Sequence, residues 1–404
     1  MQKIIKPNTV RLIQQGLFLL LISVLTAAFS TAFLVTLNYF FSLFTENLYL
    51  VFILPFFGVM TLWFYHRISY RFSTMHLNFE AIRDYRAESA KNLGLVSALV
   101  VFISASLSQL FGASTGREGA AVQYGASLGF AVSNIQGLIF KRRDYNLLVR
   151  AGIVAGFSSL FGTPLAALIF LGEKFGFKQN WYQSLQWAAA SYLSFYFSKL
   201  LNAPHSIYPQ WPNFSINSST LASLAILLLI ISFCAFLYKK IISLIDDFRL
   251  KFKIHSYCFI FFAGIALAAM TWSVGSSKYN GTGALLIQES FATVSSWTDP
   301  VLKIIFTVTS IVAGFKGGEV TPLMAIGATL GSFLSPLLEL PLVTSSAIGC
   351  IFLFSVTLKI PLTGAFLMIE LFGTSSAAIA LCYGFIFFIF GILKGDWNPF
   401  KNRF

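Results

Sequence analysis

One glycine-rich, acidic segment occurs twice in this chain. Its two copies begin 202 residues apart, at Gly116 and at Gly318, in a sequence of 404 residues. Each copy carries a glutamate, Glu118 or Glu319, at the start of a short apolar run. The spacing predicts a chain built from two related halves. The positions that recur at the same spacing are Gly116, Gly125, Ala126, Leu128 and Gly129, which return as Gly318, Gly327, Ala328, Leu330 and Gly331.

Composition excludes a soluble domain. Hydrophobic residues make up 56% of the chain, charged residues make up only 11%, and the mean hydropathy is +0.75. Every backbone polar group needs an internal partner within a bilayer, so long apolar segments of this kind form helices. We therefore predict an all-α polytopic membrane protein that contains short and broken helices. By the rule of about 20 apolar residues per span, the candidate spans are 12–42, 48–65, 93–112, 147–172, 182–201, 220–238, 256–274, 300–315, 342–370 and 374–393, and shorter glycine-interrupted runs occupy 119–135 and 321–338.

The net charge of +13 does not indicate nucleic-acid binding, because the positive residues stand at the ends of the apolar runs. Their clusters near the N-terminus, at 141–143, at 239–253 and at 394–401 follow the positive-inside rule. We expect both termini on the cytoplasmic face and the segment 202–220 on the outer face. The cysteines lie in apolar runs without paired spacing, which favours packing roles over disulfides; they are Cys234, Cys258, Cys350 and Cys382.

A second pair of matching blocks follows the acidic segments in the same order, 197 residues apart, and this order indicates duplication. We predict a single membrane transport domain over 1–404 with internal repeats at about 1–201 and 220–404. Only a short tail follows the last apolar run, so we expect no cytoplasmic regulatory domain. The matching positions are Pro164, Leu165, Glu173, Phe175 and Gly176 in the first half, and Pro361, Leu362, Glu370, Phe372 and Gly373 in the second.

The first acidic segment combines a charge at membrane depth with free backbone donors. A charged side chain at a helix centre costs about 2.5–3.5 kcal/mol, so it persists where it has a partner or a function. Glu118 follows Arg117, and a salt bridge at a helix end is the simpler interpretation. Gly116 and Gly119 leave N–H groups able to bind an anion, and the Glu118 carboxylate can compete for the same donors. Protonation would release this carboxylate, which would couple anion passage to proton movement.

The second acidic segment, 317–322, places Pro322 where a first helical turn is expected and leaves free N–H groups before it. A solvated loop position is the alternative for Glu319, although it lies between apolar runs. Two acids at one ion site suit a proton relay. We therefore predict gating and proton-transfer roles for Glu118 and Glu319.

These segments resemble the CLC family of anion channels and transporters. Residues 116–119, Gly-Arg-Glu-Gly, are similar to the family motif Gly-Lys/Arg-Glu-Gly-Pro, with Ala120 in place of the proline. Residues 318–322 stand where the family has Gly-x-Phe-x-Pro. The resemblance covers almost the whole chain. It implies a CLC-type inverted-topology repeat with re-entrant helices, a homodimer with one pathway per subunit, and Glu118 as the gating glutamate.

Departures from the common motifs are similar to the bacterial fluoride/proton antiporters of this family. Glu319 and Val320 stand where chloride-type members carry an apolar residue and a phenylalanine. Met75 holds the place of the serine in the family's Gly-Ser-Gly-Ile-Pro loop, and Lys174 holds the place of the chloride exchangers' internal proton glutamate. The resemblance therefore implies fluoride export, driven by inward protons, across a bacterial cytoplasmic membrane.

Fluoride is small and strongly hydrated, so its site needs compact donors such as backbone N–H groups and the Thr321 hydroxyl. Met75 and Phe79 would keep the pathway dry. Phe400 stands where the family has a tyrosine at the inner gate, and Thr74 and His76 replace two glycines of the Met75 loop. We expect fluoride, protons and the lipid bilayer as partners, and no metal or cofactor. The predicted anion-binding residues are Met75, Phe79, Gly116, Arg117, Gly119, Gly318, Val320 and Thr321.

Other functions are weighed against the same residues. A chloride or nitrate exchanger of the same fold is the nearest alternative, and Glu319 with Met75 argues against it. A passive anion channel needs no relay acids. An intramembrane enzyme needs a nucleophile or a metal cluster, whereas the four histidines are scattered and form no His-Glu-x-x-His motif. A non-transporting receptor would leave the duplicated acids unexplained.

Overall fold

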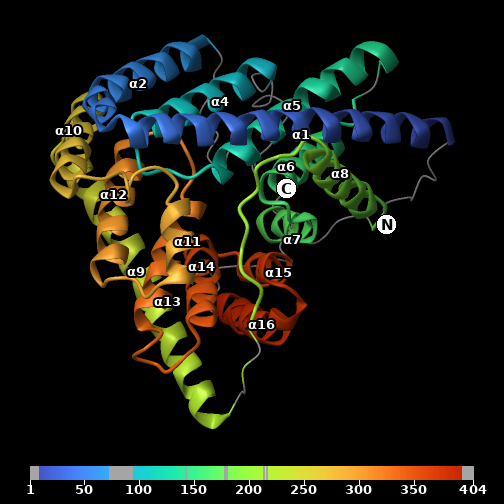
Figure 1. Cartoon of the computed structure of the whole chain (residues 1–404). Helices are drawn as coiled ribbons and strands as arrows, with labels where there is room; N and C mark the ends of the chain where they lie inside the picture. Colours follow the sequence, from blue (N-terminus) through green and yellow to red (C-terminus); the bar gives the residue numbers. More distant parts are fainter. Residues whose placement is uncertain are drawn as a thin grey trace.

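The computed structural model of the chain describes residues 9–71, 94–141, 143–176, 181–212, 214 and 217–393. These residues are almost entirely helical, which confirms the predicted all-α class (Figure 1). The first half contains α1 (Thr9–Glu46), η1 (Leu48–Ile53), α2 (Leu54–Arg71), α4 (Leu95–Leu110), α5 (Glu118–Phe140), α6 (Tyr145–Phe161), α7 (Pro164–Phe175) and α8 (Trp181–Leu200). The second half contains α9 (Ser218–Lys251), α10 (Ser256–Val274), α11 (Ala284–Ala292), α12 (Thr298–Ala313), α13 (Val320–Leu334), α14 (Leu342–Leu358), α15 (Pro361–Phe372), η3 (Thr374–Ser376) and α16 (Ala377–Leu393).

Four helical segments in the described part of the chain are long and apolar enough to cross a bilayer. They are Thr9–Glu46, Leu48–Arg67, Ser218–Lys251 and Ser256–Val274. Apolar helices of 10–17 residues occur beside them, as in α4, α6, α13, α14 and α15. The protein is thus a multi-pass membrane protein that combines long spans with shorter apolar helices.

Two of the predicted continuous spans are wrong, because each is two helices. The run 147–172 breaks between α6 and α7, and the run 342–370 breaks between α14 and α15. Gly162 ends α6 in the left-handed conformation with φ 75°, and Lys359 ends α14 in the same way with φ 57°. Proline then opens the next helix in both cases, where its fixed φ is favourable and its missing N–H costs nothing.

The recurring glycines allow two helix pairs to pack closely. Gly125 of α5 faces Gly152 of α6, and Gly327 of α13 faces Gly349 of α14. A Cβ atom on any of these four glycines would overlap the backbone carbonyl oxygen of its partner. Small residues at helix crossings let backbones approach within a membrane, where packing rather than the hydrophobic effect holds helices together. Helices α5 and α13, which begin at the two acidic segments, are fixed in place by these contacts.

Gly125→Ala is expected to destabilise the fold by about 1–3 kcal/mol, because the added methyl group must push two backbones apart. Gly16→Ala is the matched control, since no atom lies within 4 Å of a Cβ built on Gly16 in α1. Thermal unfolding of the purified proteins in one detergent checks this difference. Equal unfolding midpoints for the two variants would contradict the close-packing argument.

Glutamates at the ends of α7 and α15 cap each other's helices. Glu173 in α7 accepts hydrogen bonds from the N–H groups of Leu362 and Thr363 at the start of α15, at 2.9 and 2.7 Å, and from the Thr363 hydroxyl at 2.5 Å. Glu370 in α15 accepts from the N–H groups of Leu165 and Ala166 at the start of α7, both at 2.8 Å. Each carboxylate accepts hydrogen bonds from amides that have no partner within their own helix. The partial positive charge at that helix start also stabilises the carboxylate.

Candidate functional site

The two acidic segments meet, and most of the residues at their crossing are buried. The N–H of Gly116 donates to the carbonyl of Gly318 at 2.5 Å, and the N–H of Gly318 donates to the carbonyl of Gly116 at 2.7 Å. This antiparallel bridge is the only isolated β-bridge among the described residues. A Cβ on Gly318 would lie 2.6 Å from the Gly119 nitrogen, and Gly317 has φ 151°, so the crossing requires glycine. Helices α5 and α13 therefore begin beside one another.

Glu118 is the first residue of α5, and its carboxylate is bound to the start of α13. Its Oε2 accepts hydrogen bonds from the N–H of Thr321 and from the N–H of Arg117, both at 3.1 Å. The Thr321 hydroxyl donates to its Oε1. Only 2% of the residue is exposed. The first N–H groups of a helix lack intrahelical partners and carry partial positive charge, so this donor set is suited to an anion.

Arg117 supplies the positive charge beside the carboxylate. Its Nε lies 3.5 Å from Glu118 Oε1, and its Nη2 donates to the Ser206 hydroxyl at 3.0 Å. Within the described part of the chain, the buried Nε finds no hydrogen-bond partner. The salt bridge considered from the sequence is therefore present, but it lies beside the anion-type donors rather than in place of them.

Glu319 precedes α13 directly and points to different surroundings from Glu118. Its Oε2 accepts a hydrogen bond from the hydroxyl of Tyr238 in α9, at 3.1 Å. Lys174 in α7 and Lys239 in α9 are charged neighbours of its carboxylate. Tyr238 itself is buried, with 1% of its surface exposed. The two glutamates thus flank one helix start, with Glu118 bound to its donors and Glu319 bound to a tyrosine hydroxyl.

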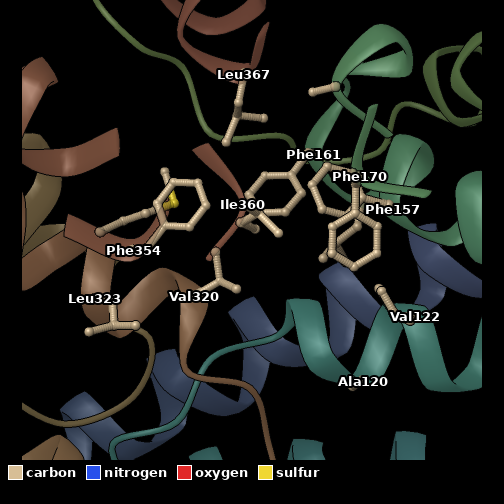
Figure 2. Close-up of a cluster of buried hydrophobic side chains, with 14 of the residues drawn as sticks. Ala120, Val122, Phe157, Phe161, Phe170, Val320, Leu323, Phe354, Ile360 and Leu367 are labelled. Atoms are coloured by element: carbon tan, nitrogen blue, oxygen red, sulfur yellow. The ribbon is translucent and has the colours of Figure 1, made fainter. Parts of the chain in front are cut away.

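Apolar side chains lie next to this helix start. Figure 2 shows a buried cluster in which Ala120 and Val122 from α5 and Val320 and Leu323 from α13 lie near aromatic and branched side chains of α6, α7, α14 and α15. Such surroundings contribute no competing hydrogen-bond donors, and low local polarity strengthens electrostatic interactions at the site. The remaining members that the figure labels are Phe157, Phe161, Phe170, Phe354, Ile360 and Leu367.

Most of the sequence-predicted site residues lie at this crossing. Met75, Phe79 and Phe400, together with Thr74 and His76, lie outside the described residues. Sequence reasoning missed Ser206 and Tyr238. No group of His, Cys, Asp or Glu residues in the described ranges has the arrangement of a metal site. The predicted residues that the structure gathers around the crossing are Gly116, Arg117, Glu118, Gly119, Gly318, Glu319, Val320 and Thr321.

Comparison with known proteins decides the family. The family model described as voltage gated chloride channel matches residues 57–387. The chain belongs to this family, the CLC family. A curated relative from Pseudomonas syringae pv. tomato, a chloride/fluoride channel protein, is 30% identical over 367 residues, which cover 89% of this chain and 80% of the relative. Membership of the CLC family makes the chain an ion-transport protein, as the acidic segments predicted.

Solved CLC structures share the fold. The crystal structure of a CLC-type fluoride/proton antiporter aligns with a TM-score of 0.85 at 26% sequence identity, over 95% of this chain and 96% of that chain. A slow cyanobacterial chloride/proton antiporter aligns with a TM-score of 0.74 at 16% identity, over 95% of this chain and 94% of that chain. The second likeness concerns the fold alone. The predicted CLC fold is therefore confirmed.

Proposed function

We propose that this CLC protein exports fluoride in exchange for protons. The observation that carries the proposal is the donor set of Thr321 and Arg117, which holds the Glu118 carboxylate at the start of α13. A small anion can take the place of that carboxylate, because it needs the same compact N–H and hydroxyl donors. The fluoride-associated relatives support this substrate, as does the glutamate at position 319.

In this mechanism Glu118 is both gate and proton carrier. While ionised, its carboxylate fills the anion site and closes it. Protonation removes its charge and weakens its three hydrogen bonds, because a charged acceptor binds a donor about twice as strongly as a neutral one. The neutral side chain then leaves and fluoride enters the donor set. The side chain releases its proton on the other side of the membrane, and its return as a carboxylate expels fluoride. Each cycle moves an anion one way and a proton the other.

Glu319 is the second acid of the proposed relay. Its carboxylate and the Tyr238 hydroxyl, 3.1 Å apart, form a short polar connection away from the Glu118 site. Both groups can carry a proton by donating and accepting hydrogen bonds. Val320 and the other proposed pathway residues, including Met75 and Phe79, then act as a dry lining, and Phe400 stands as the inner gate.

The proposal includes the wider organisation of the protein. Two inverted repeats, at about 1–201 and 220–404, form one transport domain. The protein acts as a homodimer with one pathway in each subunit. It lies in a bacterial cytoplasmic membrane with both termini inside, as the distribution of Lys and Arg at the helix ends supports.

Efflux from liposomes tests this function. Purified protein in vesicles loaded with fluoride is expected to release it at least about tenfold faster than vesicles loaded with chloride release chloride. A pH dye should record proton uptake that accompanies fluoride release, and an imposed pH gradient should drive fluoride uphill. Equal initial rates for the two ions would favour the chloride exchanger, and fluoride release without proton uptake would favour the passive channel.

A further inference from the structure

Helix α12 carries a buried polar face that the proposed transport cycle does not use. Its members, Asp299, Lys303, Thr307 and Ser310, recur at intervals of three or four residues and are almost completely buried. Lys303 is 0% exposed. A buried ammonium is costly unless it is bound, and Lys303 forms no ion pair within the described ranges. Neutral hydrogen-bond acceptors must therefore bind its ammonium group.

Four oxygen atoms surround the Lys303 ammonium. Its Nζ donates to the Ser114 hydroxyl oxygen at 2.9 Å and to the carbonyls of Tyr279 and Gly281, both at 3.0 Å. The carbonyl of Asn280 lies at 3.4 Å. Three consecutive carbonyls and a hydroxyl form the type of oxygen cage that replaces the hydration shell of a monovalent cation. The side chain therefore acts as a cation built into the fold.

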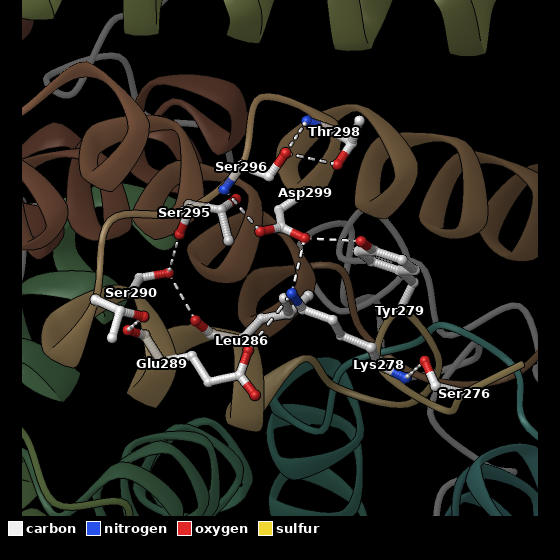
Figure 3. Close-up of polar contacts among 12 residues, drawn as sticks. Ser276, Lys278, Tyr279, Leu286, Glu289, Ser290, Ser295, Ser296, Thr298 and Asp299 are labelled. Carbon is white, nitrogen blue, oxygen red and sulfur yellow. Dashed lines mark hydrogen bonds and ion pairs between the residues drawn. The ribbon is translucent and has the colours of Figure 1, made fainter. Parts of the chain in front are cut away.

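The cage is itself anchored to α12. Figure 3 shows the Asp299 carboxylate between the Tyr279 hydroxyl, which donates at 2.7 Å, and the Lys278 ammonium at 2.9 Å. Asp299 lies one helical turn before Lys303. The loop before α11 is thus held to Asp299 by its side chains and to Lys303 by its carbonyls. Its three carbonyl oxygens would therefore stay in place if the lysine were shortened, whereas Ser114 would lose its contact with the ammonium.

The Lys303 ammonium also contacts the segment that leads to the proposed gating glutamate, Glu118. Ser114, which binds the Lys303 ammonium, also lies 3.0 Å from the Thr307 hydroxyl, and its N–H donates to the Ser310 hydroxyl at 2.9 Å. The N–H of Gly281 donates to the carbonyl of Ala113 at 3.1 Å. Two residues after Ser114 the chain enters the bridge between the two acidic segments. Helix α12, in the second half of the chain, therefore holds the residues that precede Glu118 in the first half.

We propose that Lys303 is a positioning residue, an internal substitute for a monovalent cation that holds residues 112–116 and with them the start of α5. It follows that shortening this side chain creates a site for free potassium. The binding part of the proposal is independent of the substrate. The transport part rests on the proposed fluoride/proton exchange.

Lys303→Ala is expected to bind potassium and to be stabilised by it. In choline glutamate its thermal unfolding midpoint should fall by at least about 5 °C relative to wild type. An equal concentration of potassium glutamate should restore at least half of that loss, while wild type shows no difference between the two salts. Lys303→Met is the second variant, because its side chain fills the cage without a donor, so it should be destabilised and insensitive to potassium. Val308→Ala, a buried cavity variant of the same helix, is the control and should be equally insensitive.

Fluoride exchange gives the second readout. Potassium should raise the exchange rate of Lys303→Ala severalfold over choline, and Ser114→Ala, which cuts the link to Lys303, should exchange fluoride about tenfold more slowly than wild type. Folded Lys303→Ala whose stability ignores potassium would overturn the proposal. If that variant does not fold in either salt, wild-type exchange and stability in Ser114→Ala would overturn it instead. Failure of wild type to move fluoride would count against the proposed function only, because the potassium-dependent midpoint does not depend on transport.

Discussion

Glu118→Gln is expected to yield folded protein whose proton-coupled fluoride exchange is lower by about 100-fold or more. Glutamine has nearly the same shape, but its amide neither loses nor gains a proton in the pH range of the assay. Its neutral amide oxygen can still accept from the N–H groups of Thr321 and Arg117, but only as an uncharged acceptor, and its NH2 group then replaces the oxygen that accepts from the Thr321 hydroxyl. The gate can then neither bind these donors as an anion nor deliver a proton.

Liposome assays with an imposed pH gradient measure this effect. Glu289→Gln is the matched control, because Glu289 is a glutamate with 56% of its side chain exposed and should tolerate the same change. Passive fluoride leakage through Glu118→Gln is compatible with the mechanism, since the gate has lost its charge. Uphill fluoride movement driven by protons in that variant would show that Glu118 is not the proton-transfer residue.

Glu319→Gln and Glu319→Ala are expected to fold normally and to show little or no exchange, a loss of about 100-fold. Within the described residues, Glu319 accepts one hydrogen bond from another side chain, the 3.1 Å contact with the Tyr238 hydroxyl. It takes no part in the hydrogen bonds that hold the Gly116–Gly318 bridge. Its removal therefore costs little packing, while a proton relay loses a titratable group. Tyr238→Phe removes only the hydroxyl and should lower the exchange rate by a smaller factor.

Elution profile, thermal midpoint and fluoride flux should be recorded together for these variants. An aggregated Glu319→Ala would indicate that the contact with Tyr238 is structural. Exchange at the wild-type rate in both Glu319 variants would remove this acid from the mechanism and favour the chloride-type alternative.

The fold class and the family could be predicted from the sequence, because a bilayer leaves few choices to an apolar chain. Long apolar runs must be helical there, and a duplicated Gly-x-Glu segment within them is specific enough to identify a family. The segment also made Glu118 and Thr321 candidate site residues, because its glycines and proline have physical meaning at a helix start. The structure adds how these residues meet, which is a pairing across 203 positions of the chain.

The helix breaks were harder to predict, because Gly162 and Lys359 lie within otherwise continuous apolar runs. Hydropathy does not distinguish a long span from two short helices that fold back on one another. The hydrogen-bond partners of Arg117 and Glu319 could not be predicted for a different reason. Ser206 and Tyr238 are each single polar residues with no motif, and only the tertiary fold brings them to Arg117 and Glu319. Lys303 likewise reads as an ordinary helix residue until its four oxygen neighbours are known.

The mutual capping of α7 and α15 bears on how the chain is made. The amide of Leu165 bonds to a carboxylate 205 positions later, at Glu370, so α7 leaves the ribosome long before that acceptor exists. Until then the first amides of α7 lack this acceptor, and the first half enters the membrane as an incomplete folding unit. A chain truncated before Glu370 would therefore leave these amides of α7 without that acceptor. A helix synthesised in the second half, α15, therefore completes the capping of a helix in the first half.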